Sequence, residues 1–378
     1  MKAGWACLSL LFFVSSPSAE EATETLQVSG YAKGMLIDSS TVVGPQERYT
    51  AGLNRLRVEL KGDLAKWLVV DLQVDNELTL GDYLRTEQFR LQRDSPPTWW
   101  RARTSWLDEP DAYGQARVYR ASLTASFVDT DLRVGKQRIA WGTGRFWSPL
   151  DILNPVSPTT LERAERVGVD ALLVEHKIDA LSRAAVVHAP QRDAGDASTA
   201  MMWHANRSAV DYSLVAGRFG RSRVLGGDVA GQVGQSGIRA ELTRTLPDAG
   251  PAYVRALVGL DHAFANTLSV SGELFFDGSG SRDRARYDFA ALFSGARQNL
   301  ARHYLGLSAS YDVTPLIETR HDLVLNLDDG SGCYSQALTW SLRTNLDATL
   351  GAQFFGGART TEFRAFKRLL YLQLQWFY

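Results

Sequence analysis

The chain has 378 residues and a formal net charge of −1, with 22% of its residues charged. This near balance of charge, without a basic tail, argues against a nucleic-acid partner. No segment after the first residues has the roughly 18 consecutive apolar residues that a transmembrane helix needs.

The first 19 residues have the pattern of a secretory signal peptide. Lys2 gives a positive start, residues 3–14 are an apolar run too short to cross a bilayer, and small residues follow up to Ala19. We expect cleavage after Ala19, with Ala22 as the alternative, and export of residues 20–378 as a single domain. Cleavage removes Cys7 and leaves Cys333, to which the sequence assigns no role, so an intramolecular disulfide is excluded.

Alternation of apolar and polar residues recurs from about residue 25 to the end of the chain. Between residues 53 and 61, arginines, a glutamate and a lysine share one face of the expected strand while Leu56, Val58 and Leu60 share the other. An exported chain without a transmembrane helix but with such strands is predicted to be a transmembrane β-barrel, all-β, antiparallel and up-and-down. We predict about 18 strands (16–18): 25–37, 53–63, 67–78, 116–128, 131–140, 169–178, 181–189, 200–206, 209–218, 223–232, 237–246, 252–263, 267–277, 302–312, 315–327, 333–343, 347–356 and 365–378.

The predicted connections alternate between short and long. Tight turns, such as those at 62–66, 129–130 and 344–346, are expected on the periplasmic side of an outer membrane, because barrels place their long loops outside. Three long extracellular loops are expected at 79–115, 141–168 and 278–301.

If the apolar faces meet lipid, the polar faces enclose a lumen that carries charges of both signs. Such charges could tune which solute passes, or could simply pair with one another and hydrate the wall. The candidate lining residues are Arg55, Arg57, Glu59, Lys61, Asp71, Asp75, Arg120, Arg133, Glu175, Lys177, Arg239, Glu241, Arg255, Asp261, Glu273, Glu318, Arg320 and Asp322.

The densest motif spans residues 133–155, RVGKQRIAWGTGRFWSPLDILNP, in which a strand enters a Gly-rich turn and then an aromatic segment. This run resembles the strand-and-loop pattern of Gram-negative porin-type barrels, in the wider group that contains alginate exporters and substrate-specific porins. The resemblance implies inward-folded loops and a channel for diffusion or export of small hydrophilic solutes, anionic or sugar-like, with no cofactor. It also implies that Arg133, Lys136, Arg138 and Arg145 contact the solute.

The last strand ends on an aromatic residue with apolar residues at every second position before it. This pattern is similar to the signal by which the barrel-assembly machinery recognises its substrates, and it indicates integral insertion among outer-membrane lipids. The residues concerned are Leu370, Leu372, Leu374, Trp376 and Tyr378.

Two other functions remain open. A hydrolase would need a nucleophile, a base and an orienting group; Ser308, His303 and Asp322 could supply them, although no motif surrounds them. The histidines lack the spacing of metal ligands. A non-conducting barrel that binds surface polysaccharide, or that forms the sheath of a trans-envelope complex, is the stronger alternative, because tryptophans in the long loops could stack on sugars. The oligomeric state is not indicated.

Overall fold

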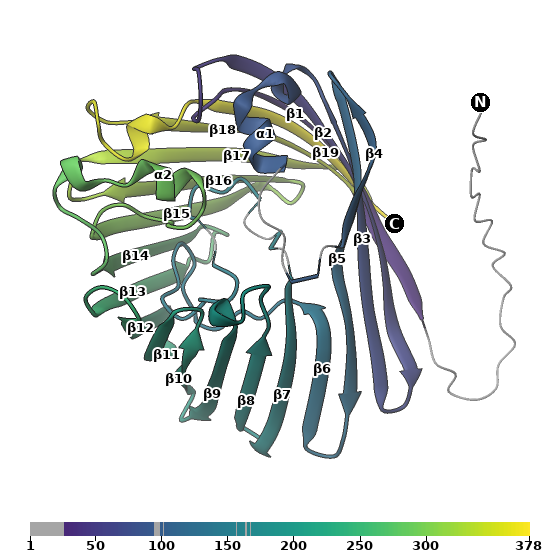
Figure 1. The fold of residues 1–378 in the computed structure, drawn as a ribbon, viewed down its shortest axis with the longest axis vertical. Coiled ribbons are helices and arrows are strands. Elements are labelled where there is room, and N and C mark those ends of the chain that lie inside the picture. The colour runs from purple at the N-terminus through teal and green to yellow at the C-terminus, as the bar shows by residue number, and fades with distance from the viewer. Residues whose placement is uncertain (1–25, 94–98, 101, 156, 163–164, 167) are drawn as a thin grey trace, which may run out of the picture.

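The computed structural model describes residues 26–93, 99–100, 102–155, 157–162, 165–166 and 168–378. The predicted signal peptide lies outside these residues. The described chain is a closed antiparallel barrel with two short helices at one end (Figure 1). The helices are α1 (Glu87–Arg93), α2 (Phe289–Phe293) and the 3₁₀ turns η1 (Asp82–Arg85), η2 (Ala194–Asp196), η3 (Arg284–Arg286) and η4 (Phe363–Ala365). The strands are β1 (Gln27–Ser40), β2 (Arg48–Ala65), β3 (Leu68–Leu80), β4 (Arg103–Glu109), β5 (Ala112–Ser126), β6 (Thr130–Gln137), β7 (Val169–Asp179), β8 (Ser182–Ala189), β9 (Ser198–Arg207), β10 (Val210–Phe219), β11 (Ser222–Val233), β12 (Ser236–Pro247), β13 (Tyr253–Ala263), β14 (Ser269–Asp277), β15 (His303–Thr314), β16 (Ile317–Asn326), β17 (Ser331–Arg343), β18 (Leu346–Gly356) and β19 (Leu369–Phe377).

The ring closes where the first strand pairs with the last. β1 and β19 are antiparallel neighbours in a register that runs from Tyr31 opposite Phe377 to Asp38 opposite Leu370. β4 pairs only with the first half of β5, whereas β6 pairs with the second half. β4 is therefore an extra segment, and the remaining strands form the closed 18-strand wall that the sequence predicted.

The wall has apolar residues outside and charged residues inside, the reverse of a water-soluble protein. Leu36 and Leu56 on neighbouring strands are 64% and 43% exposed, whereas the alternating Lys33 and Arg57 are 8% and 4% exposed. The period of two along each strand causes this separation. Among the described residues, no helix is long and apolar enough to cross a membrane.

The two ends of the barrel differ. At the short-turn end, adjacent strands are joined by a few residues; Ser208 and Ala209, with φ values of 53° and 61°, make the two-residue turn between β9 and β10. At the long-loop end, the chain runs through 81–111, 138–168 and 278–302 between wall strands.

Two local predictions were incomplete. The expected loop 79–115 contains η1, α1 and β4, and the expected strand 131–140 ends at Gln137. Gly135 has a φ of 120°, outside the β region, and shortly after it the chain leaves the wall and turns into the barrel.

Candidate functional site in the barrel interior

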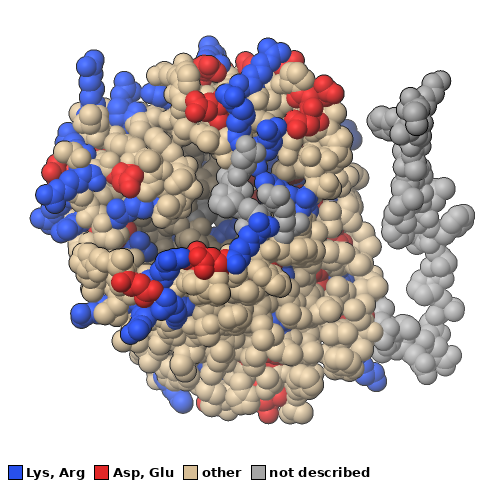
Figure 2. All heavy atoms as spheres, in the orientation of Figure 1, with Lys and Arg blue, Asp and Glu red and all other residues tan. Residues whose placement is uncertain are grey.

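The segment between β6 and β7, residues 138–168, folds into the barrel; we call it the inner loop. Its described residues contact β12 and β14 on one side of the ring and β1, β2 and β18 on another. Figure 2 shows the molecule hollowed at its centre, with charged side chains gathered around the hollow. The inner loop therefore divides the lumen and narrows it.

The first anchor of the inner loop is Glu241 of β12, which is 2% exposed. One carboxylate oxygen accepts a hydrogen bond from the backbone N–H of Gly144 at 2.7 Å and another from that of Thr143. The second oxygen accepts from the Ser148 hydroxyl at 2.8 Å and from the Leu150 N–H at 3.2 Å. A carboxylate satisfies several converging donors at once, so this residue type fits a tight turn with unpaired N–H groups.

Glu273 of β14 is the second anchor and is 1% exposed. It accepts from the backbone N–H groups of Arg145 at 2.6 Å and Phe146 at 2.8 Å, and Arg239 donates to it at 3.0 Å. Arg239 also pairs with Asp261, which holds the Arg145 guanidinium at 3.0 Å. The two glutamates thus fix the Gly-rich turn from the wall.

Aromatic packing supports the same turn. The Trp147 ring stacks on Phe275 with centroids 5.3 Å apart, and its indole N–H donates to Asn299 at 3.0 Å. Phe146 is 1% exposed and lies against Gly306, where a Cβ would be 2.6 Å from its ring. Gly306 makes room for the loop, so the wall and the loop fit each other closely.

A cluster of arginines and carboxylates, which we call the charge ladder, lines the opposite wall on β2, β3 and β5. Arg57 donates to Asp75 at 2.6 and 2.9 Å, and Arg55 donates to Glu77 at 3.0 Å. Arg117 approaches both carboxylates, at 3.3 and 2.9 Å. Arg57 and Arg117 lie directly opposite Asp75 in the strand register, and Arg55 lies directly opposite Glu77, so cross-strand neighbours neutralise one another.

The tip of the inner loop adds two carboxylates to the charge ladder. Glu162 pairs with Lys33 and with Arg55 at 3.2 Å, and Glu165 pairs with Arg57 at 2.8 Å and accepts from the Tyr31 hydroxyl at 2.9 Å. Burial alone would raise the pKa of Glu165, but the Arg57 charge and the Tyr31 hydrogen bond hold that pKa below its ordinary value. The ionised form of Glu165 is therefore favoured at the loop tip.

Within the inner loop, Asp151 pairs with Arg166. Burial raises the pKa of Asp151 to about 7, although the Arg166 charge acts in the opposite direction. Arg120 donates to the Arg166 carbonyl at 2.6 Å, which ties this pair to β5.

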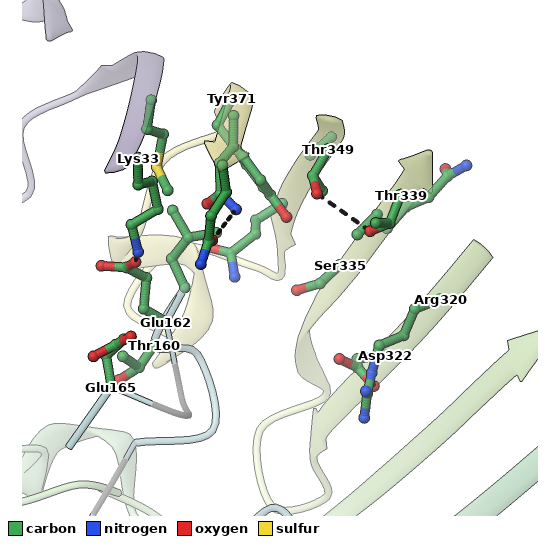
Figure 3. Close-up of a pocket in the computed structure, with 18 residues that line it drawn as sticks. Lys33, Thr160, Glu162, Glu165, Arg320, Asp322, Ser335, Thr339, Thr349 and Tyr371 are labelled. Atoms are coloured by element: carbon green, nitrogen blue, oxygen red, sulfur yellow. Dashed lines mark hydrogen bonds and ion pairs between the residues drawn. The ribbon is translucent and has the colours of Figure 1, made fainter. Parts of the chain in front are cut away.

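Part of the lumen between the loop tip and β16–β19 is open. It is a cavity of about 510 Å³, which we call the passage, and its lining includes Thr160 and Glu162 of the loop and Arg320 and Asp322 of β16 (Figure 3). One side of its wall carries neutral polar side chains: Ser335, Thr339, Thr349, Gln353, Gln373 and Gln375, with Tyr371.

The structure assembles some of the predicted residues and separates others. Arg55, Arg57 and Asp75 meet in the charge ladder; Arg145, Arg239, Asp261, Glu241 and Glu273 meet at the anchored turn; Arg320 and Asp322 pair at 3.6 Å in the passage. Glu59 and Asp71 lie nearer the short-turn end, where Asp71 accepts from Gln73.

The four motif residues with predicted solute contacts do not converge. Arg133 donates to Thr124 at 3.0 Å, Lys136 is buried against Asp170 at 2.8 Å, Arg138 is exposed where the inner loop begins, and Arg145 reaches β13. Their contact with solute stays a prediction.

Sequence reasoning missed Lys33, Glu77, Arg117, Glu162 and Glu165. Lys33 and Glu77 share the inward face of strands that were predicted, so alternation could have found them. The two loop glutamates had no such signal, because no periodic pattern places a loop tip.

The catalytic alternative does not assemble. Ser308 and His303 are five positions apart on β15 and so point to opposite faces of the wall, and His303 instead pairs with Asp328 at 2.8 Å. In the described part of the chain, no group of three His, Cys, Asp or Glu side chains is placed to hold a metal ion.

No family model and no curated protein matches the chain. Among solved structures, OccAB1 of Acinetobacter baumannii matches with a TM-score of 0.62 at 10% identity, covering 93% of this chain and 96% of that one. OpdK of Pseudomonas aeruginosa, solved with vanillate, gives 0.58 at 11% identity over 93% and 98%. OccK5 (OpdH) of Pseudomonas aeruginosa gives 0.59 at 10% over 93% and 97%. The likeness shows a shared fold, and the resemblance to porin-type barrels is confirmed at that level.

Proposed function

We propose that this chain is an outer-membrane channel for small hydrophilic solutes. One observation carries the proposal: the inner loop crosses the lumen but leaves the passage beside β16–β19 open and lined by polar groups. An apolar outer surface with a hydrated, polar interior is what a pore through lipid requires. The similarity to OpdK, a protein solved with vanillate, supports the same class of function.

We propose also that β19 carries the insertion signal read by the barrel-assembly machinery. Leu372, Leu374 and Trp376 point outward and are 51%, 49% and 51% exposed, so the outward face of the strand presents a continuous apolar row to lipid. Leu370 and Tyr378 continue the pattern at its two ends. Outer-membrane lipid would surround this face in the folded state.

The channel is tested by reconstituting the mature chain into planar bilayers. We expect stepwise single-channel currents and a shift toward cation selectivity in Arg145→Ala, because that side chain is 55% exposed and its loss leaves Asp261 with less compensation. Arg221→Ala, which removes an arginine that is 64% exposed in the β10–β11 turn, serves as the control and should change selectivity less.

A correctly folded barrel that carries no current would contradict the channel and favour the non-conducting alternative. Trp99 and Trp100, which are 54% and 46% exposed in the segment before β4, are the aromatic residues that such a polysaccharide-binding barrel would use.

A further inference from the structure

The neutral side of the passage is built by three adjacent strands. In the inward rows, Ser335 lies opposite Gln353, and Thr339 lies opposite Thr349, which lies opposite Gln373. Figure 3 shows Ser335, Thr339 and Thr349 across the cavity from Thr160 and Glu162 of the loop tip. The cavity volume of about 510 Å³ falls in the range of small-molecule sites, roughly 300–1,000 Å³.

This neutral side retains unused hydrogen-bonding capacity. The Thr339 and Thr349 hydroxyls are 3.2 Å apart, Gln373 donates to Gln375 at 3.2 Å, and Gln353 donates to the Thr159 carbonyl at 3.3 Å. Each amide has two donor hydrogens and two acceptor lone pairs, and each hydroxyl both donates and accepts. These contacts use only part of that capacity, so the wall can exchange hydrogen bonds with a hydroxylated solute.

An aromatic surface lies within the same wall. A Cβ on Gly351 would be 2.2 Å from Cζ of Tyr371, so the phenol ring lies against the Gly351 backbone, in the row between Gln353 and Thr349. A ring surrounded by amides and hydroxyls suits a solute with an apolar face and a hydroxylated edge, as sugars have.

The charged residues that line the passage disfavour binding of an anionic solute. Its lining holds two cations, Lys33 and Arg320, and three carboxylates, Glu162, Glu165 and Asp322. Lys33 is 8% exposed and pairs with Glu162, and Arg320 lies 3.6 Å from Asp322. An anionic solute would have to displace Glu162 from Lys33 and would meet Asp322 beside Arg320, whose side chain is 52% exposed, whereas an uncharged solute leaves both pairs intact.

We infer that the solute of this channel is an uncharged polyhydroxylated molecule of the sugar or polyol class, bound in transit by the β17–β19 side of the passage. The inference rests on the proposed channel function and names its substrate class. It separates the two solute classes, anionic and sugar-like, that the sequence left open.

The test uses proteoliposomes that contain the mature chain and compares uptake of labelled glucose with that of labelled glucuronate, which has the same carbon skeleton with one carboxylate. We expect glucose to enter several-fold faster. Gln373→Leu should weaken the block of single-channel current by glucose about fivefold, the effect of losing one ordinary hydrogen bond. Tyr371→Ala should weaken it as well, and Tyr371→Phe should retain most of it because the ring remains.

The control is Gln73→Leu, the same substitution on β3, outside the β17–β19 wall, where Gln73 donates to Asp71 at 3.0 Å. It should leave the glucose block unchanged. Faster entry of glucuronate than of glucose, or an equal effect of Gln73→Leu and Gln373→Leu, would overturn the inference while the channel function stands. Absence of uptake of both solutes by a folded barrel would overturn the channel function, and this inference with it.

Discussion

Glu241 and Glu273 show how single buried side chains position the inner loop. Each carboxylate accepts hydrogen bonds from backbone N–H groups in one half of the Gly-rich turn, and both side chains are shielded from bulk solvent, being at most 2% exposed. Alternation along β12 and β14 predicted that both residues face the lumen. It could not predict their role, because their partners lie about a hundred positions earlier in the chain.

Glu241→Gln tests the anchor. The amide keeps the size of the side chain but replaces one acceptor oxygen with an NH₂ group that would face N–H donors, which costs about 1–3 kcal/mol. We expect a lower free energy of unfolding in detergent and noisier open-channel current, as the loop moves in the lumen. Glu175→Gln is the control, since Glu175 lies six residues beyond the start of β7 on the way to the short-turn end. Equal noise in both variants would contradict the anchoring role.

Glu362, just before η4, makes the loops at the long-loop end sensitive to pH. It accepts from the Tyr304 hydroxyl at 2.6 Å, the Leu300 N–H at 3.1 Å and the Asn326 amide at 2.8 Å, with the Asp329 carboxylate and the Tyr287 hydroxyl close by. Burial raises its pKa to about 7, above the ordinary value of 4.5, and the hydrogen bond from Tyr304 acts in the opposite direction. The fold therefore favours the protonated acid, and this stabilisation is complete below about pH 4.5 and is lost as the pH rises through about 7.

Hydrogen exchange measured at pH 5.5 and 8.5 checks this expectation. The segment 357–368 should be better protected at the lower pH after correction for intrinsic exchange. Glu362→Gln should remain protected at both pH values, and Glu87→Gln, an exposed carboxylate at the start of α1, should behave as wild type. Protection in the wild type that does not depend on pH would exclude Glu362 as the titrating group.

At the scale of elements, the wall strands were predictable and the extra segments were not. The lumen and the lipid impose opposite polarity on alternate residues of each wall strand. β2, with Arg55 and Arg57 inside and Leu56 and Val58 outside, can therefore be predicted from its own residues alone. β4 is different, because nearly all of Arg103–Glu109 is exposed on both faces and no alternation results.

The inner loop marks the limit of sequence reasoning for the site. Its Gly-rich and aromatic composition indicated a structured loop, but its direction is set by contacts such as that between Lys33 and Glu162, 129 positions apart. The neutral side of the passage gave no signal either, since threonine, serine and glutamine are ordinary residues in any lumen-facing row. The solute that this neutral side would bind can be inferred only together with the charged residues that line the same passage.

For the whole molecule, the decisive contact is the seam between β1 and β19. Gly30 exchanges two backbone hydrogen bonds of 3.1 Å with Tyr378, and the Tyr378 hydroxyl donates to the Arg57 carbonyl at 2.8 Å. A Cβ on Gly30 would be 2.1 Å from that carbonyl oxygen and 2.7 Å from the Tyr378 hydroxyl. The seam is thus intolerant of any side chain at this position.

Gly30→Ala is therefore expected to destabilise the barrel by about 1–3 kcal/mol, as overpacking does, and to lower the folded fraction recovered from outer membranes. Gly356→Ala, at a position where a Cβ meets nothing within 4 Å, is the matched control and should change stability by less than about 0.5 kcal/mol. Urea titration of both proteins in the same detergent gives the comparison. Similar midpoints would mean that the seam adapts to the added methyl group.

The attachment of the inner loop to distant strands also constrains the order of events in assembly. Its anchors lie on β12 and β14, while its tip holds β1 and β2, the first two wall strands in chain order among the described residues. Once β1 and β19 have joined, the wall has no remaining edge, and a loop left outside could enter the lumen only through the end of the barrel at which it is attached. A loop that already rests on the concave side of the open, curved sheet avoids that route, because closure then places the wall around it.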